Sequence, residues 1–101
     1  MATPQVLYSP QARADLTAIE AYIAANDGQE RAVRIGNRLR AAARTLAHMP
    51  GMGKSRPYLA PTVRAFPVSP WTIICKPLQE LDGIFVYRVL DGRRDLPEAF
   101  G

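Results

Sequence analysis

The sequence predicts an α+β fold in which a helical hairpin packs on a small, mostly antiparallel sheet, in the order β-α-α-β-β-β. In the first half of the chain, apolar residues recur at the spacing of amphipathic helices. In the second half, β-branched and aromatic residues gather in short runs that Pro and Gly clusters separate. The 101 residues are 48% hydrophobic, which suits a single domain with one core over residues 1–101.

The N-terminal segment predicts a short strand followed by a helix. Val6-Leu7-Tyr8 is apolar and favours a strand. Ser9 can cap free backbone N–H groups, and Pro10 fits the first turn of a helix. The apolar side of this helix is formed by Ala12, Leu16, Ile19 and Ile23. Gly28 can adopt the left-handed conformation that often ends a helix.

A second helix begins almost at once, so the two helices are expected to run antiparallel as a hairpin. Asp27 and Glu30 have the spacing of a capping box, with Asp in place of Ser or Thr. The apolar stripe of this helix is formed by Ile35, Leu39, Ala42, Leu46 and Met49. Pro50-Gly51 ends the helix, and residues 50–62 are rich in Gly and Pro, which predicts a loop.

Three further runs predict an antiparallel meander, and they cover Val63 to Val68, Trp71 to Lys76 and Gly83 to Leu90. Asp82-Gly83 is a good hairpin signal between the last two runs. The last run is apolar on both faces, as a central strand is.

Charge is distributed unevenly along the chain. The formal net charge is +4, but none of the nine acidic residues falls between Arg31 and Gln79. The basic residues of that stretch are Arg31, Arg34, Arg38, Arg40, Arg44, Lys54, Arg56, Arg64 and Lys76. Arginine predominates, which suits bidentate contacts with carboxylate or phosphate. We therefore expect an acidic partner, either a nucleic acid or an acidic protein segment. The alternative is a solvated helix face that pairs with acids from elsewhere in the fold.

Arg64 and Arg88 interrupt apolar strand runs, where a charge is costly unless it is paired or faces solvent. One interpretation is structural: each side chain points outward or meets Asp91 or Asp95. The other is a basic patch on the open face of the sheet, which would bind a partner. The sequence leaves both open.

No metal site, cofactor or membrane span is predicted. The lone Cys75 cannot form an internal disulfide or, by itself, a metal site, and no Gly-rich phosphate loop follows a strand. No apolar run approaches the roughly 18–20 residues that span a bilayer, and Met1 to Val6 lacks the pattern of a secretory signal. We expect a cytoplasmic protein.

Several segments together resemble the ParE/RelE toxin superfamily. The segment from Val6 to Leu16 is similar to the family's opening strand and Pro-started helix, and Met49 to Pro57 resembles the loop after the helices. Val63 to Val68 resembles the second strand. The ending from Arg88 to Pro97 is the most specific piece and is close to that of ParE-like members. The resemblance covers Val6 to Pro97.

This resemblance implies the toxin of a type II toxin–antitoxin pair. A cognate ParD-like antitoxin would form a hetero-oligomer with the chain, and the antitoxin rather than this chain would contact operon DNA. ParE-like members are described as poisons of DNA gyrase, which makes gyrase the expected target and leaves no catalytic residue to assign. The candidate residues for binding the antitoxin or the target are Arg34, Arg38, Lys54, Arg56, Arg64, Arg88 and Arg94.

A RelE-like, ribosome-dependent mRNA endoribonuclease is the alternative function. RNA cleavage needs a base, an acid and positive charge at the phosphate. Neither Tyr nor His follows Arg94, where RNase members often carry such a residue. His48 is expected to face solvent, and Tyr58 is expected to pack in its loop. A basic binding module that has lost toxicity is the third possibility.

Overall fold

The computed structural model describes residues 3–93 and 96–100. Its elements, in chain order, are β1 (Gln5–Tyr8), α1 (Pro10–Asp27), α2 (Gln29–His48), the 3-10 turn η1 (Pro50–Met52), β2 (Lys54–Ser55), β3 (Arg64–Val68), β4 (Trp71–Pro77), β5 (Gly83–Asp91) and α3 (Leu96–Phe100). This order confirms the predicted α+β architecture and adds a short strand and a short C-terminal helix. The expectation of a continuous loop over residues 50–62 is wrong where η1 and β2 form.

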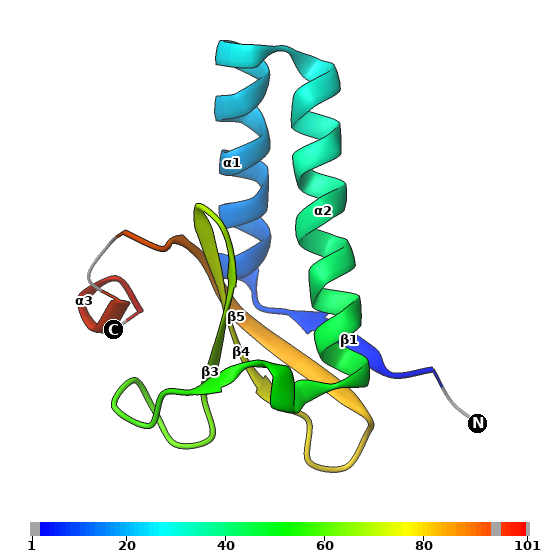
Figure 1. Ribbon diagram of the computed structural model, residues 1–101, viewed down its shortest axis with the longest axis vertical. Coiled ribbons are helices and arrows are strands. Elements are labelled where there is room, and N and C mark those ends of the chain that lie inside the picture. The colour runs from blue at the N-terminus through cyan, green and yellow to red at the C-terminus, as the bar shows by residue number, and fades with distance from the viewer. Residues whose placement is uncertain (1–2, 94–95, 101) are drawn as a thin grey trace.

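The five strands form one sheet in the order β1-β5-β4-β3-β2. β1 pairs with β5 in parallel, and the other neighbours are antiparallel. The strand β5 therefore lies between two others, as its apolar residues on both faces predicted. In Figure 1, α1 and α2 stand side by side and rise well beyond the sheet.

The start of α1 is fixed to the sheet by its cap. The Ser9 hydroxyl accepts a hydrogen bond from the Ala12 N–H at 2.9 Å and donates one to the Tyr87 carbonyl at 2.6 Å. Gly28, with φ 97°, ends α1 and leads directly into α2. The predicted capping box is wrong, because Asp27 is still part of α1 and no side chain caps α2. Asp27 instead lies 3.7 Å from Arg31 in an ion pair.

The main core lies between the two helices and the sheet. The predicted stripe of α1 is buried at Ala12, Leu16 and Ile23. The stripe of α2 is confirmed at Leu39 and Leu46 but wrong at Met49, which is 60% exposed because α2 ends one residue earlier. The buried positions of α2 are otherwise small: Ala32, Gly36, Ala43 and Ala47. At Gly36 a Cβ would lie 2.7 Å from Glu20 Oε2 of α1, so this glycine allows the two helices to approach closely.

A second, smaller cluster covers part of the opposite face of the sheet. It is built on Val63, Ile74 and Leu90. The residues packed against it include Leu59 and Ala60 from the loop before β3, and Leu96, Ala99 and Phe100 from α3. Among the described residues, no helix is long and apolar enough to cross a membrane.

Candidate functional site

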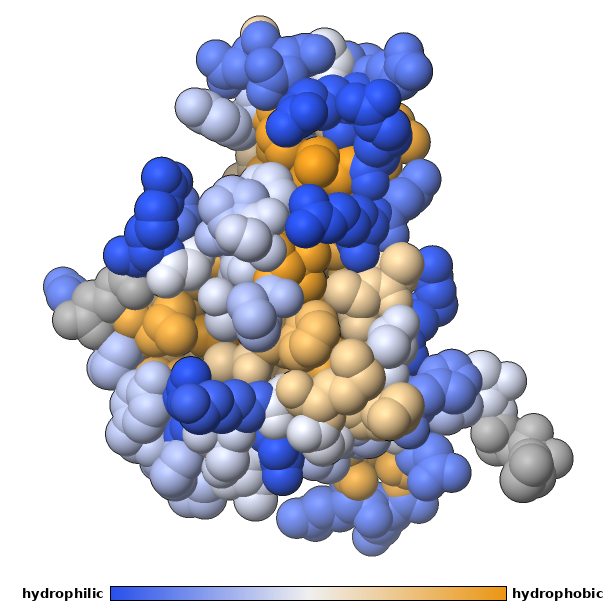
Figure 2. Space-filling view, in the orientation of Figure 1, coloured by the Kyte–Doolittle hydropathy of each residue, from blue (hydrophilic) through white to orange (hydrophobic). Residues whose placement is uncertain are grey.

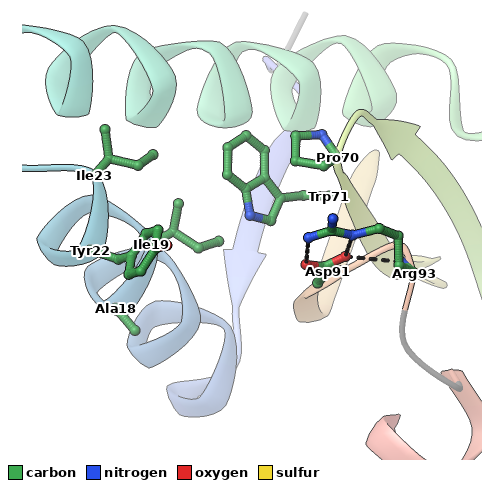
Figure 3. A pocket seen from close by; sticks show the side chains of 8 residues that line it. All are labelled: Ala18, Ile19, Tyr22, Ile23, Pro70, Trp71, Asp91 and Arg93. Atoms are coloured by element: carbon green, nitrogen blue, oxygen red, sulfur yellow. Dashed lines mark hydrogen bonds and ion pairs between the residues drawn. The ribbon is translucent and has the colours of Figure 1, made fainter. Parts of the chain in front are cut away.

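A groove of about 380 Å³ lies between α1 and the turn that joins β3 to β4. We call it the α1 groove, and its lining residues are Ala18, Ile19, Tyr22, Ile23, Pro70, Trp71, Asp91 and Arg93 (Figure 3). Apart from Asp91 and Arg93, these residues are apolar or aromatic. Figure 2 shows apolar surface that continues between the two helices, bordered by strongly hydrophilic residues. Such a surface is typical of a site that binds another protein.

Gly92 positions the β3–β4 turn against the end of β5. Its N–H donates a hydrogen bond to the Pro70 carbonyl at 2.7 Å. A Cβ at this position would lie 2.9 Å from Thr72 Oγ1 and 3.2 Å from the Pro70 carbonyl oxygen, so the approach favours glycine. On the side of α2, an Arg38 guanidinium nitrogen donates to the Ser69 carbonyl at 3.4 Å. These contacts hold Pro70 and Trp71 beside α1.

The polar end of the α1 groove is internally neutralised. Arg93 donates to Asp91 through Nε at 3.1 Å and through Nη2 at 2.7 Å. The hydrogen bond to this carboxylate, and then its negative charge, raise the pKa of Arg93. Because the two charges offset each other, the groove favours an apolar group over a single charged one.

The arginines of α2 divide into paired and unpaired residues. Arg40 forms an ion pair with Glu20 of α1 at 2.8 Å, and the hydrogen bond within that pair raises the pKa of Arg40. Arg31 pairs with Asp27. Within residues 3–93 and 96–100, neither Arg34 nor Arg38 forms an ion pair with a carboxylate.

Arg38 lies beside the α1 groove, and Arg34 lies four residues, about one helical turn, before it on α2. The Arg40–Glu20 contact sets the middle of α2 beside the middle of α1. Arg38 also reaches Ser69, next to the Pro70 that lines the groove. An apolar groove therefore lies beside cations that have no carboxylate partner in the described chain.

Arg88 is bound within the chain. Its Nε and Nη2 donate to the two carboxylate oxygens of Asp15 at 2.8 and 2.9 Å, and its Nη1 donates to the Ala99 carbonyl at 3.2 Å. The hydrogen bonds to Asp15 raise the pKa of Arg88. Of the two interpretations from sequence, Arg88 follows the structural one, with Asp15 as its partner in place of Asp91 or Asp95.

Arg64 is also hydrogen-bonded within the chain, through Nη1 to the Gly53 carbonyl at 2.7 Å, but no described carboxylate neutralises it. Lys54 is exposed at the edge strand β2, and Arg56 follows it half-buried. The candidate cations therefore lie in separate places: Arg34 and Arg38 on α2, Lys54, Arg56 and Arg64 near the β2 edge, and Arg88 on β5. Arg94 and Asp95 lie outside the described residues.

The sequence model of the ParE toxin of type II toxin–antitoxin systems, parDE, matches residues 6–96. The chain belongs to this toxin family. A curated relative, Toxin ParE3 of Caulobacter vibrioides, is 32% identical over 89 residues, which are 86% of this chain and 85% of the relative. A solved structure described as the chromosomal ParDE TA system from P. aeruginosa superposes with a TM-score of 0.73 at 21% identity, covering 88% of this chain and 96% of that one. This similarity confirms the predicted fold.

Membership in the ParE family makes the chain a toxin component whose system includes an antitoxin. Sequence reasoning singled out the arginines of α2 but missed Tyr22, Pro70 and Trp71, which form the α1 groove. Tyr22 lies beside Ile19 and Ile23 in the printed sequence, and 70% of it is exposed. An aromatic residue next to an apolar stripe is the one signal that could have indicated this surface.

The residues considered for RNA cleavage are both exposed in this ParE-family chain, His48 at the end of α2 and Tyr58 in the loop before β3. One ring nitrogen of His48, Nδ1, lies 2.9 Å from the Arg44 carbonyl. The exposure of His48 confirms that it faces solvent, whereas Tyr58, at 61% exposure, does not pack as expected. Within the described residues, no group of three His, Cys, Asp or Glu side chains could hold a metal ion.

Proposed function

We propose that this toxin is neutralised by an acidic segment of a ParD-like antitoxin that binds in the α1 groove. The α1 groove beside the unpaired Arg34 and Arg38 supports the proposal. A partner helix or extended segment with apolar residues on one side and carboxylates on the other complements both features. Acidic tails of this kind are often disordered until they bind, and arginines can order them by bidentate contacts.

We further propose that the free toxin stops growth by poisoning DNA gyrase in the cytoplasm. Membership in the ParE family supports this target, because the resemblance to ParE-like toxins implies a gyrase poison without nuclease chemistry of its own. In the hetero-oligomer with the antitoxin, operator DNA is contacted by the antitoxin. Neutralisation then removes the toxin from gyrase by mass action.

The target is tested by mixing the purified chain with gyrase, ATP and supercoiled plasmid, and then denaturing the protein. Linear plasmid, formed only when both toxin and gyrase are present, is the expected result. The antitoxin, added first in equimolar amount, should suppress it. An intact plasmid, together with messages cut on translating ribosomes, would show the RelE-like activity instead.

The docking site is tested separately by titrating the chain with a synthetic peptide that covers the C-terminal half of the cognate antitoxin. Loss of peptide binding when residues of the α1 groove are substituted supports this docking site. Peptide binding that is unchanged by such substitutions contradicts it. This measurement does not depend on gyrase, so the proposed docking site and the proposed target can each be refuted without the other.

A further inference from the structure

The strands of the sheet carry cations and almost no acids. β1 to β5 contain Lys54, Arg64, Lys76 and Arg88, and their one acidic residue is Asp91, which binds Arg93. Arg88 is neutralised by Asp15. Positive charge therefore remains at Lys54, Arg64 and Lys76, among strands that offer no free carboxylate within the described residues.

Two of these cations share the face of the sheet that points away from α1 and α2, which we call the outer face. Alternate residues of β4 separate the two faces: Ile73 and Cys75 belong to the helix-side core, whereas Ile74 belongs to the opposite cluster. Lys76 follows Ile74 on the same face. Residues that pair directly across neighbouring strands lie on the same face of the sheet. Lys54 pairs with Ala65, and Ala65 pairs with Ile74, so Lys54 lies on the outer face as well.

Aromatic rings accompany these lysines on the outer face. The Lys76 ammonium lies 5.9 Å from the centre of the Phe85 ring and 5.7 Å from that of Tyr87. The two rings meet edge to face at 5.0 Å, and Tyr87 also meets Phe100 of α3 edge to face at 5.4 Å, so α3 covers part of Tyr87. Tyr58 is 61% exposed in the loop whose neighbouring residues, Leu59 and Ala60, pack against this face.

Part of the outer face is uncovered. The loop before β3 and α3 cover the cluster of Val63, Ile74 and Leu90. Beyond them, toward β1, Leu7 pairs with Phe85 in the sheet and remains 43% exposed. The rings and lysines therefore border an open apolar surface, which is the arrangement expected of a binding site and not of a solvated charge.

We propose that the outer face binds single-stranded nucleic acid, with Lys54 and Lys76 at the phosphates and with Phe85 and Tyr58 as surfaces on which bases stack. Strand spacing and residue rise place the Cα atoms of Lys54 and Lys76 about 12 Å apart, a distance that a few nucleotides span. A single strand alternates phosphates with flat bases, and this alternation matches the interleaved cations and rings. An acidic peptide matches the charges alone.

This site goes beyond the proposed function and does not rest on it. The α1 groove is formed with α1 on the other side of the sheet, so a segment bound there leaves the outer face open. Stacking accepts any base, and the outer face is therefore expected to bind DNA and RNA strands with little sequence preference.

The site is tested by fluorescence anisotropy of the full chain with labelled oligo-dT and oligo-U across a series of salt concentrations. The intact chain is expected to bind both. Lys76→Gln and Lys54→Gln should each weaken binding and lower the slope of log affinity against log salt by about one. Phe85→Leu and Tyr58→Ala should each weaken binding about fivefold or more through lost stacking.

Arg34→Gln is the matched control, because it removes one positive charge from α2 and should change affinity less than twofold. Circular dichroism serves to check that Phe85→Leu is folded. Tyr58→Ala tests stacking at an exposed side chain, so it leaves the core unaltered. Three results would overturn the proposal: no binding at low salt, equal weakening by Lys76→Gln and Arg34→Gln, or displacement by poly-glutamate as effective as displacement by unlabelled oligonucleotide.

Discussion

Arg88 of β5 binds both carboxylate oxygens of Asp15 of α1, at 2.8 and 2.9 Å. The same carboxylate accepts the Val89 N–H at 2.9 Å, and Arg88 also donates to the Ala99 carbonyl in α3. One ion pair thus connects α1, the inner strand β5 and α3. The Arg88 side chain is therefore part of the fold, and we expect Arg88→Ala to lower the melting temperature more than it weakens antitoxin binding.

Asp15→Asn tests the energetic importance of this ion pair. The side chains of Arg88 and Asp15 are only 26% and 15% exposed, so the substitution leaves a guanidinium poorly solvated and unpaired. We expect urea unfolding to show a loss of about 1–3 kcal/mol. Asp27→Asn is the control, because its pair with Arg31 is long and exposed, and a loss there of about 0.5 kcal/mol or less is expected. Equal losses in the two variants would contradict the argument.

Tyr22→Ala tests the α1 groove. Because 70% of Tyr22 is exposed, its removal should change the melting temperature little, yet it takes away one wall of the groove. We expect calorimetry to show antitoxin affinity reduced about tenfold or more, as for an aromatic residue at the centre of an interface. Tyr58→Ala, a matched change at a similarly exposed tyrosine in the loop before β3, should leave antitoxin binding intact. A loss with Tyr58→Ala alone would place the antitoxin on the outer face.

The double variant with Arg34→Gln and Arg38→Gln tests the role of charge at the same surface. Neither arginine pairs with a described carboxylate, and the hydrogen bond from Arg38 to the Ser69 carbonyl is long, at 3.4 Å, and exposed, so their removal should cost little stability. Unpaired cations at the rim of an interface act mainly on the rate of association. We expect stopped-flow measurements to show slower antitoxin association and a weaker dependence on salt. An unchanged association rate would mean that the acidic part of the antitoxin lies elsewhere.

The helices and strands could be predicted from the sequence because their signals are local. Ser9 and Pro10 mark the start of α1, and short runs of β-branched and aromatic residues mark β4 and β5. The predicted capping box is wrong because Gly28 alone separates the two helices, and Gly28, which is the N-cap residue of α2, has no side chain that could accept a backbone hydrogen bond. Local spacing does not contain that information.

The α1 groove could not be predicted in the same way, because it joins segments that only the fold brings together. Ile19 and Tyr22 come from α1, Trp71 from β4, and Arg93 from the end of β5. The partner of Arg88 was missed for the same reason, since Asp91 is near in sequence whereas Asp15 is near in space. The uneven distribution of charge along the sequence predicted an acidic partner. Only the tertiary structure shows which arginines form ion pairs within the chain, as Arg40 does with Glu20, and which, such as Arg34, do not pair with a described carboxylate.

Cys75 predicts a dependence of stability on alkaline pH. Burial raises the pKa of its thiol from 9.0 to about 11. Between these values the unfolded chain releases the proton while the folded chain retains it, so the free energy of unfolding falls as pH rises. We expect the intact chain to lose about 2 kcal/mol more than Cys75→Ala between pH 8 and pH 11. Tyr8, whose pKa is also raised, is present in both chains and cancels. Parallel losses would show that the thiol is accessible to water in the folded chain.

Gly92→Ala tests whether the turn between β3 and β4 shapes the α1 groove. The added Cβ would lie 2.9 Å from Thr72 Oγ1 and 3.2 Å from the Pro70 carbonyl oxygen, so the turn must move away from β5. Overpacking of this kind costs about 1–3 kcal/mol, and because Pro70 and Trp71 move with the turn, antitoxin affinity should fall as well. Gly51→Ala is the control, since a Cβ there meets nothing within 4 Å and should change neither quantity. If Gly92→Ala destabilises the chain but leaves antitoxin affinity unchanged, Pro70 and Trp71 do not contact the antitoxin, and the docking surface is confined to the helices.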